Sequence, residues 1–272
     1  MENERVEKII STVRHDVFQD IKFDYRGKAV LVSGARTGIG LAAAQKFAEA
    51  GANVILAGRH EPSAEAQDLR NKGYQAISVR ADVTNDEDVF KMVDTAVKEF
   101  GKLDIAFNNA GIMTEALEIE KTEIAAYDSV VNTNLRSVWL AMHYEVEQMK
   151  KQGHGGSIIN CGSTASVVAM AGRSPYVTSK HGIVGLSKAV ALEVAKYDIN
   201  VNVIGPGNVY SQMVQQMFDQ EPDLMCEYVE GSVAGRIGSG EECAALIMYL
   251  ASYAARYVTG QVICIDGGYT IA

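Results

Sequence analysis

Short runs of consecutive apolar residues alternate with amphipathic stretches over most of the chain. A short apolar run is typical of a strand buried on both faces, and apolar residues three and four positions apart indicate a helix. Strands are expected at Ala29–Val32, Asn53–Ala57, Gln75–Arg80, Leu103–Phe107, Ser157–Cys161, Asn200–Ile204 and Val262–Ile265. Helices are expected from a glycine-rich turn to Ala50, then at Ser63–Lys72, Asp86–Phe100, Leu135–Lys150, Tyr176–Tyr197 and Glu241–Ala251.

Strands that alternate with helices predict a parallel sheet with helices on both faces. Right-handed crossovers then give an α/β, doubly wound fold of about seven strands, whose site lies at the carboxyl ends of the strands. No linker rich in proline, glycine or serine divides residues 25–272, so we expect them to form one domain that carries the whole site.

Residues 1–24 form an N-terminal segment with a different pattern. Its apolar residues recur at helical spacing with charged residues between them: Val6, Ile9, Ile10, Val13 and Val17. This predicts an amphipathic helical arm whose apolar stripe is buried against this subunit or a neighbouring one. A packing helix or a frayed extension is favoured over a catalytic role.

Composition narrows the classes of function. The 272 residues are 47% hydrophobic and 22% charged, which is typical of a soluble globular protein. The net charge of −9 argues against nucleic acid or an anionic membrane as the main partner. No apolar run approaches the roughly 18 residues of a membrane span, and the first residues do not resemble a signal or transit peptide. Four widely spaced cysteines do not suggest a zinc site or a redox dithiol, so a cytoplasmic location and a site without metal are expected.

The glycine-rich turn Ser33-Gly34-Ala35-Arg36-Thr37-Gly38-Ile39-Gly40 joins the first expected strand to the first helix. Glycines let a backbone approach a pyrophosphate closely, and a helix N-terminus supplies N–H donors and a positive dipole end. The spacing is G-x-x-x-G-x-G, which differs from the G-x-G-x-x-G dinucleotide fingerprint. A purely structural turn between strand and helix is the alternative.

Three polar side chains between residues 163 and 180 suggest acid–base chemistry. Ser163 follows the fifth expected strand, and Tyr176 and Lys180 lie one helical turn apart on the same face of the next helix. Ser174 is expected to cap that helix and Pro175 to occupy its first position. A free tyrosine is a poor base at neutral pH, and a nearby ammonium favours the phenolate form. A hydroxyl, a phenol and an ammonium that converge suggest proton transfer at a substrate oxygen.

The ordered motifs resemble those of the short-chain dehydrogenase/reductase family over roughly residues 24–272. The turn is similar to the family's T-G-x-x-x-G-x-G, with serine at the first position. The further matches are Asn108–Gly111 (NNAG), Asn134-Leu135, Ser163, Tyr176 with Lys180, Pro206-Gly207 with Ser211 in place of threonine, and Asp266–Gly268. The chain is identified as a member, with a Rossmann-like fold. The N-terminal arm lies outside the resemblance.

The resemblance implies hydride transfer between a nicotinamide and a carbonyl or secondary alcohol. Tyr176 is then the acid and base, and Lys180 supports the phenolate and binds the nicotinamide ribose. Ser163 is expected to hydrogen-bond the substrate oxygen, and Asn134 to help hold a proton-relay water, with Asn132 a weaker candidate. Without the family pattern, the Tyr176–Lys180 pair would be an ordinary contact on an amphipathic helix.

The resemblance also implies a set of residues that contact the cofactor. They are Gly34, Arg36, Thr37, Gly38, Ile39, Gly40, Arg59, Asp82, Val83, Asn109, Ala110, Gly111, Tyr176, Lys180, Pro206, Gly207, Val209 and Ser211. Asp82 and Val83 are expected at the adenine and Ser211 at the nicotinamide amide. A helix cap is the alternative for Asp82, a loop cap for Ser211, and backbone support of the sheet for Asn109.

The end of the second expected strand bears on the choice of cofactor. Relatives that prefer NAD tend to carry Asp at the position of Gly58, which Arg59 follows here. A carboxylate would repel a 2′-phosphate, whereas a guanidinium binds it in a fork geometry. NADP(H) is therefore favoured, with NAD(H) possible. Arg36 adds a second positive charge or is simply an exposed arginine.

The resemblance implies a mobile lid over the substrate between about residues 208 and 235. Its apolar residues Met213, Met217, Phe218, Leu224 and Met225 suit an adaptable pocket, although plain packing explains them equally well. The substrate is expected to be a small molecule, and a steroid, sugar, polyol, acyl thioester or small ketone all fit.

Members of the family usually associate through the helices corresponding to Leu135–Lys150 and Pro175–Tyr197, so a homotetramer or homodimer is expected. Two other functions stay open on the same scaffold. One is a non-catalytic NADP(H)-binding sensor or scaffold protein, and the other is lyase or epimerase chemistry.

Overall fold

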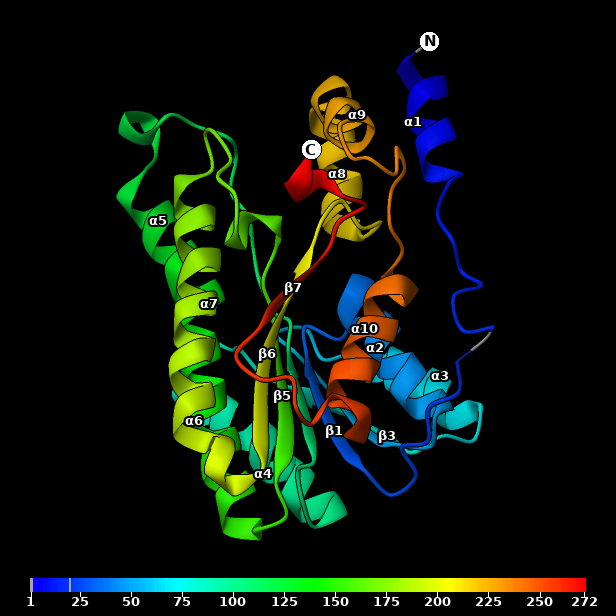
Figure 1. Ribbon diagram of the computed structural model, residues 1–272, viewed down its shortest axis with the longest axis vertical. Coiled ribbons are helices and arrows are strands. Elements are labelled where there is room, and N and C mark those ends of the chain that lie inside the picture. The colour runs from blue at the N-terminus through cyan, green and yellow to red at the C-terminus, as the bar shows by residue number, and fades with distance from the viewer. Residues whose placement is uncertain (1, 20) are drawn as a thin grey trace.

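A seven-stranded parallel sheet forms the centre of the protein (Figure 1). The computed structural model describes residues 2–19 and 21–272, apart from the side chains of residues 2, 3 and 213. The strands are β1 (Ala29–Ser33), β2 (Asn53–Gly58), β3 (Ala76–Arg80), β4 (Ile105–Asn108), β5 (Gly156–Cys161), β6 (Ile199–Pro206) and β7 (Val262–Ile265). Their order in the sheet is β3-β2-β1-β4-β5-β6-β7, which confirms the predicted doubly wound fold.

The strand order reverses between β1 and β4. Successive strands run outward from β1 through β2 to β3, and then from β4 through to β7 on the other side. β1 is buried along its whole length, and its register with β2 pairs Ala29 with Asn53 and Ser33 with Ala57. The crevice at such a reversal, beyond the carboxyl ends of the strands, is where doubly wound folds bind ligands.

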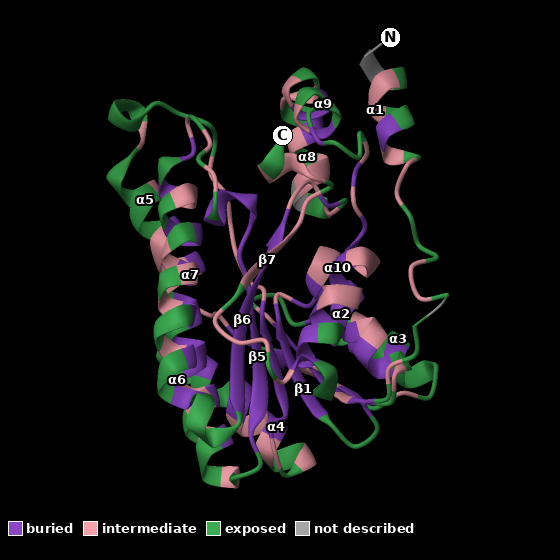
Figure 2. Ribbon diagram, in the orientation of Figure 1, coloured by how far each residue is buried: buried purple, intermediate pink, exposed green. Residues whose placement is uncertain are grey.

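Helices cover both faces of the sheet, as the alternating pattern predicts. On one face lie α2 (Gly38–Glu49), α3 (Ser63–Asn71) and α10 (Gly240–Ala251). On the other face lie α4 (Asp86–Phe100), α6 (Ser137–Gln152) and α7 (Ser174–Val194). Figure 2 shows the inner strands buried between these two layers, while β7 is half-buried and the outward faces of the helices are exposed. None of the described helices is both long and apolar enough to cross a membrane.

The region between β4 and α6 contains helical structure that the apolar pattern does not predict. α5 (Ile124–Val131) passes directly into a π-helical segment, Asn132–Arg136, which continues into α6. A π-helical turn inserts an extra residue into the helical ladder and often marks a functional site. The insertion shifts the helical period, so one periodic pattern cannot extend through Asn134.

The start of α7 corrects one expectation. Ser174 is the first helical residue, and Arg173 occupies the N-cap position without a side-chain hydrogen bond to the helix. Ser174 therefore does not cap the helix. Pro175 lies in the first turn, as expected, because its missing N–H costs nothing there.

The segment expected to be a lid forms two helices, α8 (Gln212–Gln220) and α9 (Pro222–Glu230), above the carboxyl edge of the sheet (Figure 1). Phe218 and Met225 are buried in a small core of their own, whereas Met217 also faces the cavity described below. Leu224 is half-buried. The Met213 side chain lies outside the described residues. Some apolar residues of this segment are therefore packed in the small core, and Met217 also lines the cavity.

The N-terminal arm packs on the lid of its own subunit. Its helix α1 (Glu2–Ile10) ends before Val13 and Val17, so it is shorter than the periodic stripe. Ile9 is buried in the small core with Phe218 and Met225. Arg5 donates two hydrogen bonds to Glu230 of α9, at 3.0 and 2.6 Å. The arm therefore adds a third helix to the lid.

Candidate active site

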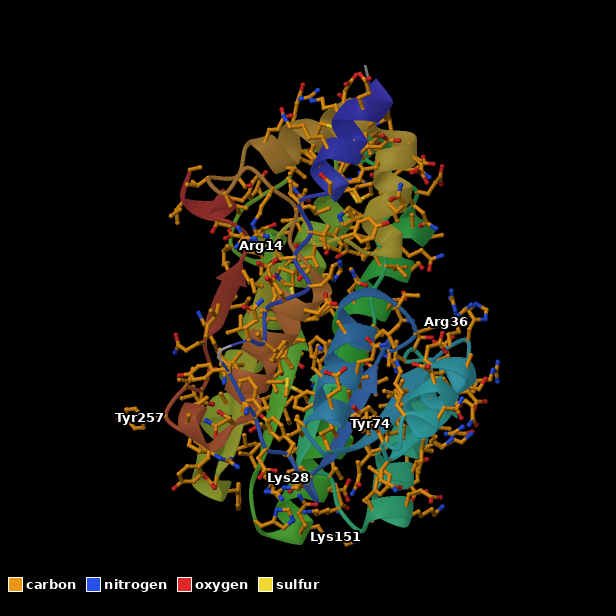
Figure 3. All side chains as sticks on the ribbon, turned by 90° about the vertical axis from the view of Figure 1, so that its right-hand side faces the viewer. Arg14, Lys28, Arg36, Tyr74, Lys151 and Tyr257 are labelled. Atoms are coloured by element: carbon orange, nitrogen blue, oxygen red, sulfur yellow. The ribbon has the colours of Figure 1, made fainter. Side chains whose placement is uncertain are left out.

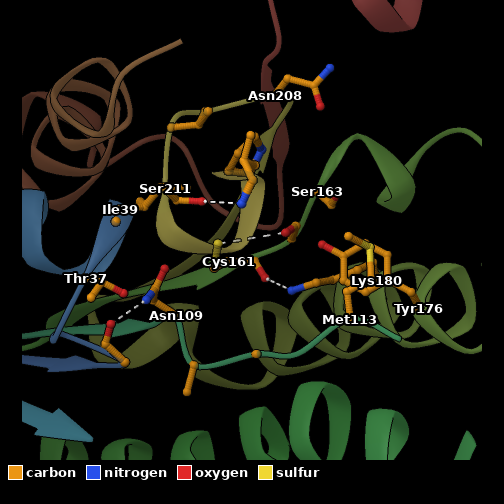
Figure 4. A pocket seen from close by; sticks show the side chains of 18 of the residues that line it. Thr37, Ile39, Asn109, Met113, Cys161, Ser163, Tyr176, Lys180, Asn208 and Ser211 are labelled. Atoms are coloured by element: carbon orange, nitrogen blue, oxygen red, sulfur yellow. Dashed lines mark hydrogen bonds between the residues drawn. The ribbon is translucent and has the colours of Figure 1, made fainter. Parts of the chain in front are cut away.

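A cavity of about 370 Å³ lies at the carboxyl ends of the strands, where the strand order reverses. The glycine turn and the end of β2 line one part of it. The residues after β4 and β5, the start of α7, the end of β6 and the lid line the rest. Figure 4 shows Thr37 and Asn109 toward one side, and Met113, Tyr176 and Lys180 toward the other. The cavity thus brings together the glycine turn and the three polar residues.

The glycine turn is a backbone cradle that only glycine permits. Gly34 and Gly38 have φ angles of +64° and +58°, which disfavour any residue with a Cβ. A Cβ on Gly40 would lie 2.4 Å from the carbonyl oxygen of Gly34 and 2.6 Å from Nδ2 of Asn109. α2 begins at Gly38, so its first N–H groups point at the cavity end of the turn. A diphosphate fits such a cradle.

Asn109 braces the glycine turn. Its Nδ2 donates to the carbonyl oxygens of Ser33 and Gly34, at 3.2 and 3.1 Å. In return, Ser33 Oγ accepts from the backbone N–H groups of Asn109 and Ala110, at 3.0 and 3.3 Å. The hydroxyl at position 33, serine here, links the ends of β1 and β4. Asn109 therefore supports the backbone and also lines the cavity.

Two arginines lie at the end of the cavity nearest β2. Arg36, Gly58 and Arg59 line it, and Arg36 extends over the surface beside α3 (Figure 3). The Arg36 Nε lies 3.9 Å from Oε1 of Glu65. No described acidic residue lines the cavity itself, although the protein carries a net charge of −9. This end is therefore suited to an anionic group.

Asp82 and Val83 do not line the cavity. Asp82 Oδ1 accepts from the backbone N–H and the hydroxyl of Thr84, at 2.9 and 2.7 Å. These hydrogen bonds, with Arg59 nearby, hold the pKa of Asp82 below its usual value. The cap of α4 is Asn85, whose side chain accepts from the N–H of Asp88. Asp82 is thus neither the helix cap nor part of the cavity wall.

Tyr176 and Lys180 project from α7 into the cavity. Lys180 Nζ lies 5.5 Å from the centre of the Tyr176 ring and donates to the carbonyl of Cys161, at 2.8 Å. Lys180 is only 4% exposed. A buried ammonium with one carbonyl partner has further protons to donate to a ligand. Tyr176 is half-buried.

Ser163 begins a single 3₁₀ turn immediately after β5. Its Oγ accepts from the backbone N–H of Ala165, at 3.1 Å, while Ser166 Oγ accepts from the backbone N–H of Ser163. These two bonds fix the serine at the cavity wall. The Ser163 hydroxyl proton is left to donate to a substrate oxygen, since a hydroxyl both accepts and donates.

Asn134 is fully buried within the π-helical segment and does not line the cavity. Its side chain donates to the carbonyl of Ile112 and to Ser179 Oγ, and accepts from the N–H of Ile112. It therefore ties the loop after β4 to α7. A Cβ on Gly111 of that loop would lie 3.3 Å from Asn134 Oδ1 and 3.7 Å from Lys180 Nζ. Asn132, the weaker candidate, interacts on the surface with Arg136.

The segment after β6 completes the cavity. Pro206, Gly207, Val209 and Ser211 all line it. Ser211 caps α8, because its side chain accepts from the N–H of Val214 at 3.2 Å. Ser211 therefore has the capping role that was the alternative to cofactor contact, and it also faces the cavity. The remaining predicted cofactor residues in the wall are Thr37, Ile39, Ala110 and Gly111.

Comparison with known proteins assigns the family. A profile described as enoyl-(acyl carrier protein) reductase matches residues 34–270. The A-factor type gamma-butyrolactone 1'-reductase (1S-forming) of Streptomyces virginiae is 37% identical over 246 residues, covering 90% of this chain and 96% of its own. The cyclohexanol dehydrogenase of an Acinetobacter species is 35% identical over 248 residues, with 90% and 96% covered. The chain belongs to the short-chain dehydrogenase/reductase family.

Solved structures agree with this assignment. The crystal structure of a short-chain type dehydrogenase/reductase from Mycobacterium marinum superposes with a TM-score of 0.86 at 36% identity. The superposition covers 94% of this chain and 99% of that one. Levodione reductase gives a TM-score of 0.87 at 31% identity, with 91% and 99% covered.

Within this short-chain dehydrogenase/reductase, the sequence did not single out most of the wall beyond Tyr176 and Ser163. That wall is formed by Met113, Met170, Val214, Met217 and Tyr228, with Thr164 and Asn208 among the polar neighbours. Only Met217 was expected there by name. Met113 and Met170 had a detectable signal, since each closely follows a motif that faces the cavity. Tyr228 had none, because α9 reaches the cavity only through the fold.

Proposed function

We propose that the protein is an NADP(H)-dependent oxidoreductase that interconverts a carbonyl compound and a secondary alcohol. The observation that carries the proposal is the convergence of Ser163, Tyr176 and Lys180 on the cavity that the glycine turn also lines. The balanced reaction is ketone, NADPH and a proton giving secondary alcohol and NADP⁺. When bound, the nicotinamide supplies or accepts the hydride.

The side chains supply the proton and position the oxygen. Ser163 Oγ, already accepting from Ala165, donates its proton to the substrate oxygen and stabilises charge that develops there. The Tyr176 hydroxyl donates its proton to that oxygen during reduction and takes it back during oxidation. Lys180, held by the carbonyl of Cys161, stabilises the phenolate by its positive charge and directs its other protons to the cofactor ribose.

Asn134 acts at one remove in this proposal. Its side-chain bonds to Ile112 and Ser179 hold the loop carrying Gly111 close to Lys180. A π-helical turn is frequent at functional sites, and Asn134 holds Gly111 close to Lys180, so this position suits a proton relay that starts at Lys180. Asn134 is thus proposed to hold the relay in place.

NADP(H) is proposed over NAD(H) because of the charges around the cavity. Arg36 and Arg59 line the end of the cavity nearest β2 and no described acidic residue lines it, which supports binding of a 2′-phosphate there. An arginine fork binds a phosphate with two charge-assisted hydrogen bonds. Gly58 occupies the position from which a carboxylate would bind the ribose hydroxyls.

Replacement of the tyrosine tests the proposal. Tyr176→Phe keeps the ring and removes the acid, so turnover should fall by at least about a hundredfold. The dissociation constant for NADPH should stay within a factor of about two, because the glycine turn and both arginines are unchanged. Turnover is followed as NADPH absorbance and binding as nicotinamide fluorescence. A variant with near-normal turnover would contradict the tyrosine mechanism.

We also propose a homotetramer, or a homodimer, in the cytoplasm. Large apolar side chains project from the outer faces of α6 and α7, where Trp139 is 51% and Leu192 is 87% exposed. Such residues are commonly covered in an assembly. Sedimentation of a monomer at micromolar concentration would refute the proposed oligomer.

The proposed cytoplasmic location is supported by the cysteines. The free thiols of Cys161, Cys243 and Cys264 suit a reducing compartment.

A further inference from the structure

Building on the proposed hydride transfer, we propose that the substrate is a free, uncharged ketone or secondary alcohol with an apolar body. Substrates that carry a carboxylate are rejected, and so are thioesters held on a carrier that bears phosphate groups. Two independent features of the site point to this class. One is the wall of the cavity beyond the reacting centre, and the other is the charge around its mouth.

The wall that faces the substrate is made of apolar and thioether side chains from three parts of the chain. They are Met113 from the loop after β4, Met170 from the loop before α7, and Val214, Met217 and Tyr228 from the lid. The charged side chains that line the cavity are Arg36 and Arg59 at the β2 end, and Lys180, which is bonded to the Cys161 carbonyl. Flexible methionines adapt to apolar groups of varied shape.

Arg173, a cation next to this wall, is already neutralised. Its side chain is 7% exposed and does not line the cavity. One end of the guanidinium donates to the carbonyl of Thr114, and Nη2 lies 3.6 Å from Oε2 of Glu221. A substrate carboxylate against this wall would therefore lose its water without gaining a cation from Arg173. Burying an unpaired carboxylate is strongly unfavourable.

Two segments that contribute to this wall are acidic, and in this proposal they form the mouth of the cavity. Residues 114–123, which continue from Met113, contain four glutamates and one lysine. Residues 212–230 of the lid contain five acidic residues and no basic one. Eight of these nine carboxylates are on exposed residues: Glu115, Glu118, Glu120, Glu123, Asp219, Asp223, Glu227 and Glu230.

Basic partners offset only part of this charge. Lys121 pairs with Glu118, and Arg5 pairs with Glu230 and Asp223. Like charges that meet at an interface disfavour encounter and binding. The phosphates of coenzyme A, or the surface of an acidic carrier protein, would approach this mouth against repulsion. A small neutral molecule meets no such barrier.

Substrates that share one reacting group and differ in charge provide the test. On an acyclic scaffold these are ethyl acetoacetate, the neutral N-acetylcysteamine thioester of acetoacetate, acetoacetate itself and acetoacetyl-coenzyme A. On a ring they are cyclohexanone, a ring-carboxylated cyclohexanone and its methyl ester. The measurement is kcat/KM with NADPH for each, at low and at high ionic strength.

On at least one scaffold, the neutral members should exceed the carboxylate by about a hundredfold in kcat/KM. The neutral thioester should likewise exceed acetoacetyl-coenzyme A, and salt should narrow that gap because it screens the mouth. Equal kcat/KM for neutral and charged partners would overturn the proposed substrate class. Turnover of no neutral ketone on either scaffold would instead contradict the proposed function.

Charge-reversal variants distinguish the effect of the acidic segments from the effect of the apolar wall. Glu115→Lys and Glu227→Lys place a cation on each of these two segments, at exposed positions that do not line the cavity. Each should raise kcat/KM for acetoacetyl-coenzyme A several-fold and leave ethyl acetoacetate unchanged. Glu99→Lys makes the same charge change near the end of α4, at the opposite edge of the sheet, and should affect neither. An equal gain from Glu99→Lys would show that overall charge, and not the mouth, governs rejection.

Discussion

Glu145 makes the stability of the protein depend on pH in a specific way. It projects from α6 into the core and is fully buried. Its Oε2 accepts from Asn108 Nδ2 at 3.0 Å, while Oε1 has no hydrogen-bond partner. Asn108 is bonded in turn to Asn160, and Asn160 to Ser187. This polar cluster lies between β4, β5 and the helices α6 and α7.

Burial raises the pKa of Glu145 from 4.5 to about 7, against the opposing effect of the Asn108 hydrogen bond. The folded state therefore holds the proton more tightly than the unfolded chain does. The stability that protonated Glu145 contributes is fully present below the pKa that this carboxyl has in the unfolded chain. It is lost as the pH rises through the pKa that the carboxyl has in the folded protein. Above that range, the ionised side chain costs the folded state about 3 kcal/mol.

Glu145→Gln removes the titration and keeps an oxygen that accepts from Asn108. Wild type and variant should be similarly stable near pH 5, and the variant should be more stable by about 2 to 3 kcal/mol near pH 8. Urea unfolding, followed by far-UV circular dichroism at both pH values, gives the free energy of unfolding of each protein. The quantity compared is the change in that free energy between the two pH values, for the variant against the wild type. Glu147→Gln, on the exposed side of the same helix, should follow the wild-type profile. Parallel profiles for wild type and Glu145→Gln would refute the assignment of a buried, protonated acid.

Two further predictions concern the cofactor. Gly40→Ala places a Cβ within 2.4 Å of a backbone oxygen of the same turn, so the affinity for NADPH should fall at least about tenfold. Fluorescence titration measures this, and unchanged affinity would show that the turn does not form the cradle. Arg59→Ser should lower the ratio of kcat/KM for NADPH over NADH by about tenfold or more, since it removes a charge-assisted partner of the 2′-phosphate. An unchanged ratio, or a wild-type preference for NADH, would contradict the NADP(H) proposal.

The sheet could be predicted from the sequence because its inner strands are buried on both faces. β1, β5 and β6 are buried along their whole length, and their sequences are largely apolar, although β5 also buries Asn160 and β6 buries Asn200 and Asn202. The helices that cover the sheet carry a regular apolar stripe and were found near their true bounds. The π-helical turn at Asn134 could not be found, because a change of helical period within a few residues leaves no periodic signal.

The lid and the arm depend on tertiary contacts that local patterns do not encode. α8 and α9 mix apolar, amide and acidic residues, and each has an apolar face toward a separate small core. The stripe of the arm predicts a helix to Val17, but the structure ends it at Ile10, after Ile9 has reached that core. Ser174 has a residue type that commonly caps helices. The N-cap of α7 is nevertheless one residue earlier, at Arg173, whose side chain donates a hydrogen bond to the carbonyl of Thr114.

The residues of the candidate site that could be predicted are those whose type is required by local backbone geometry or by helical spacing. Gly34, Gly38 and Gly40 are fixed by backbone geometry, and Tyr176 and Lys180 by helical spacing. The part of the wall that the lid supplies was not predictable, because Tyr228 reaches the cavity only after the lid has folded over the sheet. The adenine contact expected of Asp82 stays a prediction, while its side chain also accepts hydrogen bonds from Thr84 of its own loop.

Transfer of isotope tests the central claim most directly. NADPH carrying deuterium at the transferable position of the nicotinamide is incubated with a neutral ketone, and the alcohol is analysed by mass spectrometry. Hydride transfer predicts one deuterium on the carbinol carbon, on one face only, and a hundredfold slower appearance with Tyr176→Phe. Alcohol formed without deuterium, or cofactor bound without any transfer across a broad panel of carbonyl compounds, would contradict the account.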